Sequence, residues 1–182
     1  NKDKRVRQRA QFELVNRHAV PQLHSVAINP QYPTIARCHA LWALSSLSRT
    51  QGRNHLPQIC LSDDDAQVRA QFLRSANEIH DKRSEAWFVK GLSDASPQVQ
   101  YFAALGLAHY QGHLRLLYSH AATTDRFVRS ALVEAVAAQA LTGELSSLRA
   151  EHSQEQLMLS VLALRKTRSA ELVKFLDDNN VE

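Results

Sequence analysis

Nine histidines are spread along this chain of 182 residues, and they are the side chains from which a metal site would most readily be built. Such a site needs ligands at helical i, i+4 spacing or on adjacent helices. Only His109 and His113 have the helical spacing, and the residues Tyr110-Gln111-Gly112 between them indicate a loop. We interpret the histidines as surface and helix-end residues, and we predict no metal and no other cofactor.

The acidic run Asp63-Asp64-Asp65 is the next candidate for chemistry. A calcium loop would continue with spaced oxygen ligands and a distal glutamate. Here the run passes directly into Val68-Arg69, which is the pattern of a loop followed by a helix N-cap. We therefore predict a structural role for these carboxylates.

No catalytic constellation is present in the sequence. Glu78, His80 and Asp81 form a polar cluster without a nucleophile, and neither a nucleophile elbow nor a phosphate-binding glycine motif occurs. We predict that this segment is not an enzyme, and no small-molecule substrate is evident.

A phrase that returns about every thirty residues indicates which elements position these side chains. Its fullest form is Asp-x-x-Val-Arg-x-x-Ala, and its fifth position falls at Arg7, Arg37, Arg69, Gln100 and Arg129. A fixed period in this range is typical of a solenoid built from stacked repeats. Each repeat reads as two antiparallel helices, and an aspartate that can cap the first helix opens several of them. The aspartates are Asp3, Asp65 and Asp125.

The helices are expected from the apolar spacing at three and four residues. The first helices are predicted at 4–17, 34–49, 66–79, 97–110, 126–140 and 154–166, each burying a wide apolar stripe. The second helices are predicted at 19–28, 54–61, 83–92, 113–121, 142–150 and 169–178, with a more polar face lining a concave side. The predicted fold is an all-α, right-handed α-solenoid of about six helical pairs, forming one domain over 1–182.

Composition supports helices joined by short loops, because only 5 glycines and 5 prolines punctuate a chain that is 44% hydrophobic. No apolar run is long enough to span a membrane, and no membrane insertion is expected. The net charge is +4, and a basic cluster within 2–17 is interpreted as a solvated helix face. The chain begins inside a repeat, and we interpret it as a fragment of a longer protein.

The cysteines and tryptophans have structural interpretations. Cys38 and Cys60 are predicted to be small buried hydrophobes, with a disulfide as the alternative in an exported parent. Trp42 is predicted to lie in the core. Trp87 is predicted to close a gap between repeats, with an exposed binding anchor on the concave side as the alternative.

The repeated phrase resembles HEAT repeats, especially the short bacterial form called HEAT-like or PBS-lyase-type repeats, and the resemblance covers nearly the whole chain. It implies that the phrase's aspartates and arginines stack from repeat to repeat as a polar ladder. The ladder residues would be Asp3, Arg7, Arg37, Asp65, Arg69, Asp125 and Arg129. Gln100 departs from the pattern, and the ladder is expected to be interrupted there.

A narrower resemblance is carried by Val6–Leu14, Ala36–Leu44 and Val99–Ala104. These segments look like the HEAT portion of large planctomycete-type proteins that join a sorbosone-dehydrogenase-like propeller, a HEAT array and a c-type cytochrome domain. The resemblance implies an exported or periplasmic parent whose chemistry belongs to its other domains. This chain has no haem-attachment motif of its own.

We predict that the chain is a non-catalytic scaffold whose concave face binds a protein partner or another domain of the same chain. The residues expected on that face are His24, Arg53, Trp87, Lys90, Arg115 and Tyr118. One alternative is nucleic-acid binding, as in the HEAT-like DNA glycosylases, which would require a concentrated positive stripe. A third interpretation is a lyase built on similar repeats, which would need a polar pocket.

Overall fold

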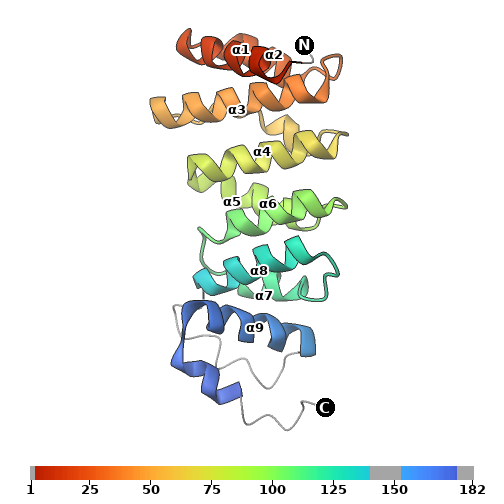
Figure 1. The fold of residues 1–182 in the computed structure, drawn as a ribbon, viewed down its shortest axis with the longest axis vertical. Coiled ribbons are helices and arrows are strands. Elements are labelled where there is room, and N and C mark those ends of the chain that lie inside the picture. The colour runs from red at the N-terminus through yellow and green to blue at the C-terminus, as the bar shows by residue number, and fades with distance from the viewer. Residues whose placement is uncertain (1–2, 140–152, 176–182) are drawn as a thin grey trace. The chain divides into compact units, whose positions relative to one another are not determined.

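The computed structural model describes residues 3–139 and 153–175, and all regular structure within them is helical (Figure 1). None of the helices in these two ranges combines the length and the apolar character needed to cross a membrane. Because all regular structure in the described residues is helical, the fold class is all-α, as the repeat period predicted.

The structure contains long first helices and shorter second elements, in the order that the sequence predicted. The first helices are α1 (Lys4–Asn16), α3 (Thr34–Gln51), α4 (Ala66–Ile79), α6 (Pro97–Leu107), α8 (Arg126–Gln139) and α9 (Gln154–Thr167). The second elements are α2 (Val20–Ile28), the 3-10 helix η1 (Gln58–Ser62), the pair η2 (Lys82–Ser84) and α5 (Glu85–Leu92), α7 (Leu114–Ser119), and the 3-10 helix η6 (Ala170–Phe175).

The largest departure from the predicted elements lies in the second repeat. An α-helix over 54–61 was expected, but the structure has only the 3-10 helix η1. Pro57 has no N–H to donate and therefore cannot lie in the interior of an α-helix without loss of a hydrogen bond. The Asn54 side chain accepts a hydrogen bond from the Leu56 backbone N–H at 2.9 Å, which holds the preceding turn. The expected helix at 142–150 lies outside the described residues.

Aspartate caps begin several first helices, as predicted. A carboxylate oxygen of Asp3, Asp65 and Asp125 accepts the backbone N–H two residues further on, at 2.8 Å in each case. Each bond satisfies one of the N–H groups that the first turn of a helix leaves unpaired. The phrase therefore marks the start of a helix because its aspartate accepts a hydrogen bond from the first turn.

The chain divides into two compact units, Asn1–Ala103 and Ala104–Glu182, which we call the N-terminal and C-terminal units. In the N-terminal unit, α3 packs against α1, α2 and α4. Its core includes Leu41, Leu44 and Phe72, which have no exposed surface. Gly91 of α5 permits a close approach, because a Cβ there would lie 2.5 Å from a methyl carbon of Leu73.

The first helix of the N-terminal unit departs from the expected wide apolar stripe. No residue of α1 is buried, and Val6 and Phe12 are 47% and 54% exposed. Among the described elements α1 packs chiefly against α3, so its remaining surface stays uncovered. A first helix buries a full stripe only where neighbours flank it on both sides.

The C-terminal unit contains α7, α8, α9 and η6, with α8 packed against α7 and α9. Its core includes Leu117, Leu132 and Val136, which are completely buried. A buried polar contact also joins two repeats, since the Tyr118 hydroxyl lies 2.6 Å from the Ser160 hydroxyl. The single domain over 1–182 and the right-handed superhelix stay predictions.

Candidate functional site

The predicted surface residues of the N-terminal unit have different environments. Arg53 follows Gly52, whose φ of 63° ends α3, and its side chain is exposed. Lys90 is also exposed, and its Nζ donates to the Ser62 hydroxyl at 2.8 Å. His24 is half-buried, with Nε2 lying 2.5 Å from the His55 carbonyl oxygen. Two of these predicted residues are thus cations available at the surface.

The C-terminal unit contains the other two predicted surface residues, Arg115 and Tyr118. Arg115 is exposed. Tyr118 is not a surface residue, because only 4% of it is exposed and its hydroxyl contacts Ser160. Burial raises the pKa of the Tyr118 phenol. The prediction for Tyr118 was wrong: its ring belongs to the core, and its hydroxyl finds a buried partner on α9.

The two tryptophans differ in exposure, and the prediction of a core position for Trp42 was wrong. Trp42 was expected in the core but is 37% exposed, and the Arg74 guanidinium lies over its ring at 4.9 Å from the centroid. Trp87 is half-buried and packs on the buried ring of Phe72, with centroids 5.0 Å apart. Trp87 therefore fills space against Phe72, and Trp42 presents the more accessible indole.

Two arginines of the repeated phrase, Arg37 and Arg69, bridge successive repeats in the N-terminal unit. Arg37 of α3 is 4% exposed and forms an ion pair with Asp63, and its Nε donates to the Ala27 carbonyl at 3.0 Å. Arg69 of α4 forms a bidentate pair with Asp94, with both N–O distances at 2.8 Å. These pairs raise the pKa of both guanidinium groups.

The acidic partners differ from those that the HEAT resemblance implied. The arginines pair with Asp63 and Asp94, which lie two residues before the cap positions Asp65 and Ser96. Each of these two carboxylates also accepts the N–H of the cap residue, at 3.0 and 2.8 Å. The Arg69 guanidinium lowers the pKa of Asp94. Each of these two carboxylates thus stabilises its own loop and also binds the arginine of the preceding first helix.

The cap residue Asp65 has a separate role. Its carboxylate accepts the Gln67 N–H and the Thr34 hydroxyl, and the Thr34 bond is the main reason that its pKa is lowered. Asp65 therefore also joins two repeats, but through a hydroxyl group at the start of the preceding first helix.

The ion-pair series changes after Arg69–Asp94. The next arginine position is Gln100, whose side-chain amide donates to the Asp94 carbonyl at 2.6 Å. The residue two before the Asp125 cap is Thr123, so neither residue type of the pair is present at this step. Arg129 is exposed and donates to the Thr123 carbonyl at 2.9 Å. The corresponding position before Ser153 is Glu151, which lies outside the described residues.

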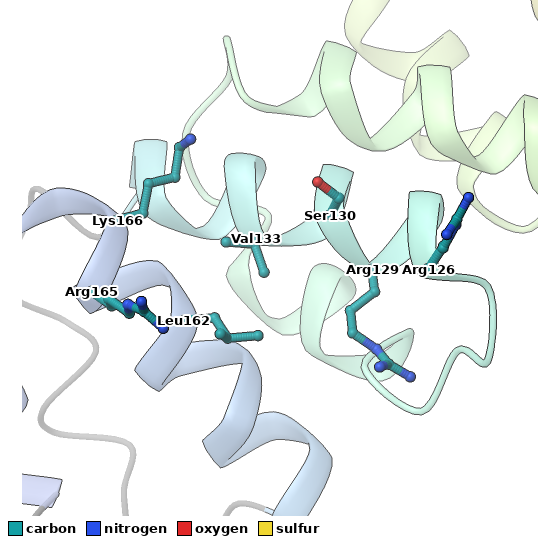
Figure 2. A pocket seen from close by; sticks show the side chains of 7 residues that line it. All are labelled: Arg126, Arg129, Ser130, Val133, Leu162, Arg165 and Lys166. Atoms are coloured by element: carbon teal, nitrogen blue, oxygen red, sulfur yellow. The ribbon is translucent and has the colours of Figure 1, made fainter.

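A basic groove lies between α8 and α9 of the C-terminal unit (Figure 2). It is an open depression of about 470 Å³. We define the basic groove by the seven residues that line it, which are Arg126, Arg129, Ser130, Val133, Leu162, Arg165 and Lys166. Four of these seven side chains are cationic, and all four are exposed.

The floor of the basic groove is apolar. Figure 2 shows Val133 on α8 and Leu162 on α9 between the charged side chains, and both are half-buried. Lys166 forms an ion pair with Glu134 at 2.6 Å, which joins the two helices. Arg126 lies over the exposed ring of Phe127, 4.7 Å from its centroid. The groove therefore combines positive charge with accessible apolar surface.

The repeat pattern and the motifs of the sequence did not predict this groove. The residues come from two helices with residues 140–153 of the sequence between them, and no single segment contains the cluster. The available signal was the repeat period, because Val133 and Leu162 lie 29 residues apart and thus occupy the same position of successive repeats. Placing both first helices side by side by this period would have brought their cations together.

The cysteines are free thiols in the structure. Cys60 is 1% exposed and Cys38 is partly exposed, and burial raises the pKa of each thiol to about 11. Across residues 3–139 and 153–175, no three His, Cys, Asp or Glu side chains gather in a way that could hold a metal ion. The thiols are thus protonated at neutral pH, which is typical of structural cysteines.

Comparison of the sequence with known protein families gives a match. The family model for HEAT repeats matches residues 53–137, a little under half of the chain. The matched segment runs from the loop after α3 to the last turn of α8 and thus includes the Arg69–Asp94 pair. The match supports a HEAT-like repeat protein with an α-solenoid type of fold. No curated protein matches the chain.

Proposed function

We propose that this chain is a non-catalytic HEAT-repeat scaffold that binds a protein partner, or another domain of the same protein, through its surface. HEAT repeats are commonly protein-interaction scaffolds, and the family match supports this class of function. The observation that carries the proposal is the contrast between buried and exposed arginines. Arg37 and Arg69 join repeats, whereas the basic groove leaves four cations at the surface.

The accessible aromatic residues add to this proposal. Trp42 and Phe127 are 37% and 58% exposed, and each has an arginine stacked on its ring. Aromatic and arginine side chains are enriched in protein interfaces, where they contribute much of the binding energy. Exposed residues of these two types together are consistent with a surface that contacts another protein.

We also propose that the parent protein has further domains, as the resemblance to planctomycete-type multidomain proteins suggested. In that case the scaffold would connect or orient domains that carry chemistry of their own. The segments Val6–Leu14 and Ala36–Leu44 support this origin. The partner surface could then be occupied by a neighbouring domain in cis.

Crosslinking with surface-charge variants tests the proposed function. The chain would be incubated with extract of its source cells, crosslinked at low salt, and the attached proteins identified by mass spectrometry. We expect a defined protein that is lost when exposed cations outside α1 are reversed in charge, either Arg53 with Lys90 or Arg126 with Arg165. The same protein should be retained with Arg5→Glu, a change on the exposed α1. Crosslinking that is independent of every surface variant would contradict a specific interaction.

A nucleic-acid titration examines the alternative directly. The chain would be titrated into a short labelled duplex at low and moderate salt, with fluorescence anisotropy as the readout. Binding through phosphate contacts weakens steeply as salt rises, because counterions are released from the duplex. Tight binding with a steep salt dependence would replace the protein-interaction proposal by the nucleic-acid alternative, whereas no binding at low salt supports the scaffold.

A further inference from the structure

We propose that the basic groove binds an acidic segment of a protein, in which an apolar side chain stands between acidic residues. This inference rests on the proposed function and specifies the chemistry of the partner. It also identifies a surface that the repeat pattern did not predict, since only Arg129 among the seven lining residues belongs to the repeated phrase.

The charge of the groove favours an acidic occupant. Arg126 and Arg165 are exposed, and within the described ranges neither of them forms an ion pair. Lys166 is paired with Glu134, but its side chain remains 47% exposed. An unpaired guanidinium group presents several N–H donors in a plane, and carboxylates match this geometry with two hydrogen bonds.

The apolar floor favours a protein segment over a nucleic acid. Val133 and Leu162 are half-buried, so part of each side chain remains accessible in the groove. The seven lining residues include no aromatic ring on which a base could stack, and the neighbouring Phe127 ring already carries the Arg126 guanidinium on one face. Free stacking platforms are typical of single-strand binding sites. An aliphatic side chain fits this floor better than a sugar or a base.

The positions of the cations suggest a spacing for the occupant. The Lys166–Glu134 pair fixes the end of α9 beside the middle of α8. Arg129 lies five residues before Glu134 along the same helix, which is on the order of 8 Å at the helical rise. An extended chain covers this distance in about two to three residues. The pattern acidic–apolar–acidic therefore places its carboxylates near cations from both helices.

The test uses the whole chain and a labelled synthetic peptide. The peptide carries a Glu-Glu-Leu-Glu-Glu core between glycine and serine flanks, and a second peptide has serine in place of leucine. The groove variant is Arg126→Glu combined with Arg165→Glu. The matched control is Lys4→Glu combined with Arg9→Glu, which makes the same change in net charge with exposed residues of α1. Circular dichroism melts verify that each variant is folded.

We expect the groove variant to weaken binding of the leucine peptide about tenfold or more, whereas the control variant changes it by less than about threefold. The serine peptide should bind about tenfold more weakly than the leucine peptide, because an apolar contact is lost. Amide shifts in NMR spectra should move in α8 and α9 on adding the leucine peptide. Equal losses in the two variants, equal affinity for the two peptides, or no peptide binding at all would overturn the inference.

The crosslinking experiment separates this inference from the proposed function. A crosslinked protein that is lost with Arg53→Glu combined with Lys90→Glu and retained with the groove variant would leave the scaffold function in place and reject the basic groove as its binding site. Displacement of the leucine peptide by a short duplex, with a steep salt dependence, would overturn the inference in favour of phosphate binding.

Discussion

The two units of the molecule use the same repeat position in different ways. In the N-terminal unit, Arg37 and Arg69 are held by aspartates of the following repeat and stabilise the packing between repeats. In the C-terminal unit, Arg129 is exposed and lines the basic groove. The arginine alone therefore does not define its role. The residue two before the next cap is an aspartate for both Arg37 and Arg69, whereas for Arg129 it is Glu151, which lies outside the described residues.

This comparison extends to the other contacts between repeats. In the N-terminal unit, a buried contact between repeats joins charged groups, those of Arg37 and Asp63. The C-terminal unit uses a neutral contact between the hydroxyls of Tyr118 and Ser160. Charged buried pairs are strongly sensitive to loss of one partner, whereas an exposed arginine can be changed with little effect on folding. Substitutions of the repeat arginine in the two units should consequently differ in how much they lower the free energy of unfolding.

The largest effect is expected from Arg37→Met. This change removes the guanidinium group and leaves the Asp63 carboxylate without its buried partner, so it should lower the free energy of unfolding by about 3–5 kcal/mol. Arg129→Met in the C-terminal unit should change it by less than about 0.5 kcal/mol. Urea denaturation followed by circular dichroism measures both values. Similar effects of the two substitutions would remove the distinction between the units.

Leucine truncation in each core should have effects of comparable size in the two units. Leu44 in α3 and Leu107 in α6 are both completely buried. Leu44→Ala and Leu107→Ala should each cost roughly 2–5 kcal/mol, because each removes buried apolar surface and leaves a cavity. Thermal and urea unfolding provide the measurement. An unchanged melting temperature for either variant would contradict its position in the core.

Substitution of the tryptophans in the N-terminal unit should lower stability by less than Arg37→Met or the leucine truncations. Trp87→Ala removes the contact with Phe72 and should destabilise the protein by roughly 1–3 kcal/mol. Trp42→Ala should cost less than about 1 kcal/mol, because the indole is partly exposed and loses mainly its contact with Arg74. Iodide should quench Trp42 fluorescence more strongly than that of Trp87. The reverse order in stability or quenching would contradict these placements.

Acid titration should produce the mildest effect. Asp94 and Asp81 have pKa values below the usual 3.8, mainly through Arg69 and Arg83, and that of Asp81 is about 2. A lowered pKa in the folded state contributes stability above the unfolded value, and this contribution is lost as pH falls through the folded value. Stability should therefore decline between about pH 4 and pH 2.

The fluorescence of Trp42 and Trp87 follows the unfolding of the N-terminal unit during this titration, because both tryptophans lie in that unit. Asp94→Asn should reduce the dependence of stability on pH over this range. An equally steep loss of stability in this variant would exclude the Arg69–Asp94 pair as one of its causes.

Much of the fold could be predicted because the repeat period and the caps are local in sequence. The first helices were placed correctly, since Asp65 caps α4 through its own neighbour Gln67. The second elements were harder, because short stretches such as 54–61 depend on a single residue, Pro57, and on packing. The narrow turn of η1 could have been anticipated from that proline.

The candidate site was less predictable because it depends on tertiary neighbours. The sequence cannot show that Tyr118 meets Ser160 across 42 residues, nor that Trp42 lies beside Arg74. The exposure of an aromatic ring on a helix depends on which side has a neighbour. The arginine ladder was anticipated from a family resemblance, but its acidic partners are Asp63 and Asp94, which only the packing of adjacent repeats identifies.

A double-mutant cycle on Arg69 and Asp94 tests most directly whether the repeat arginine joins successive repeats. The cycle compares Arg69→Met, Asp94→Asn and the double variant by urea denaturation. With two N–O contacts of 2.8 Å and side chains that are 16% exposed, we predict a coupling energy of about 1–3 kcal/mol. Effects that add to within about 0.3 kcal/mol would contradict the pairing and its role in packing the repeats.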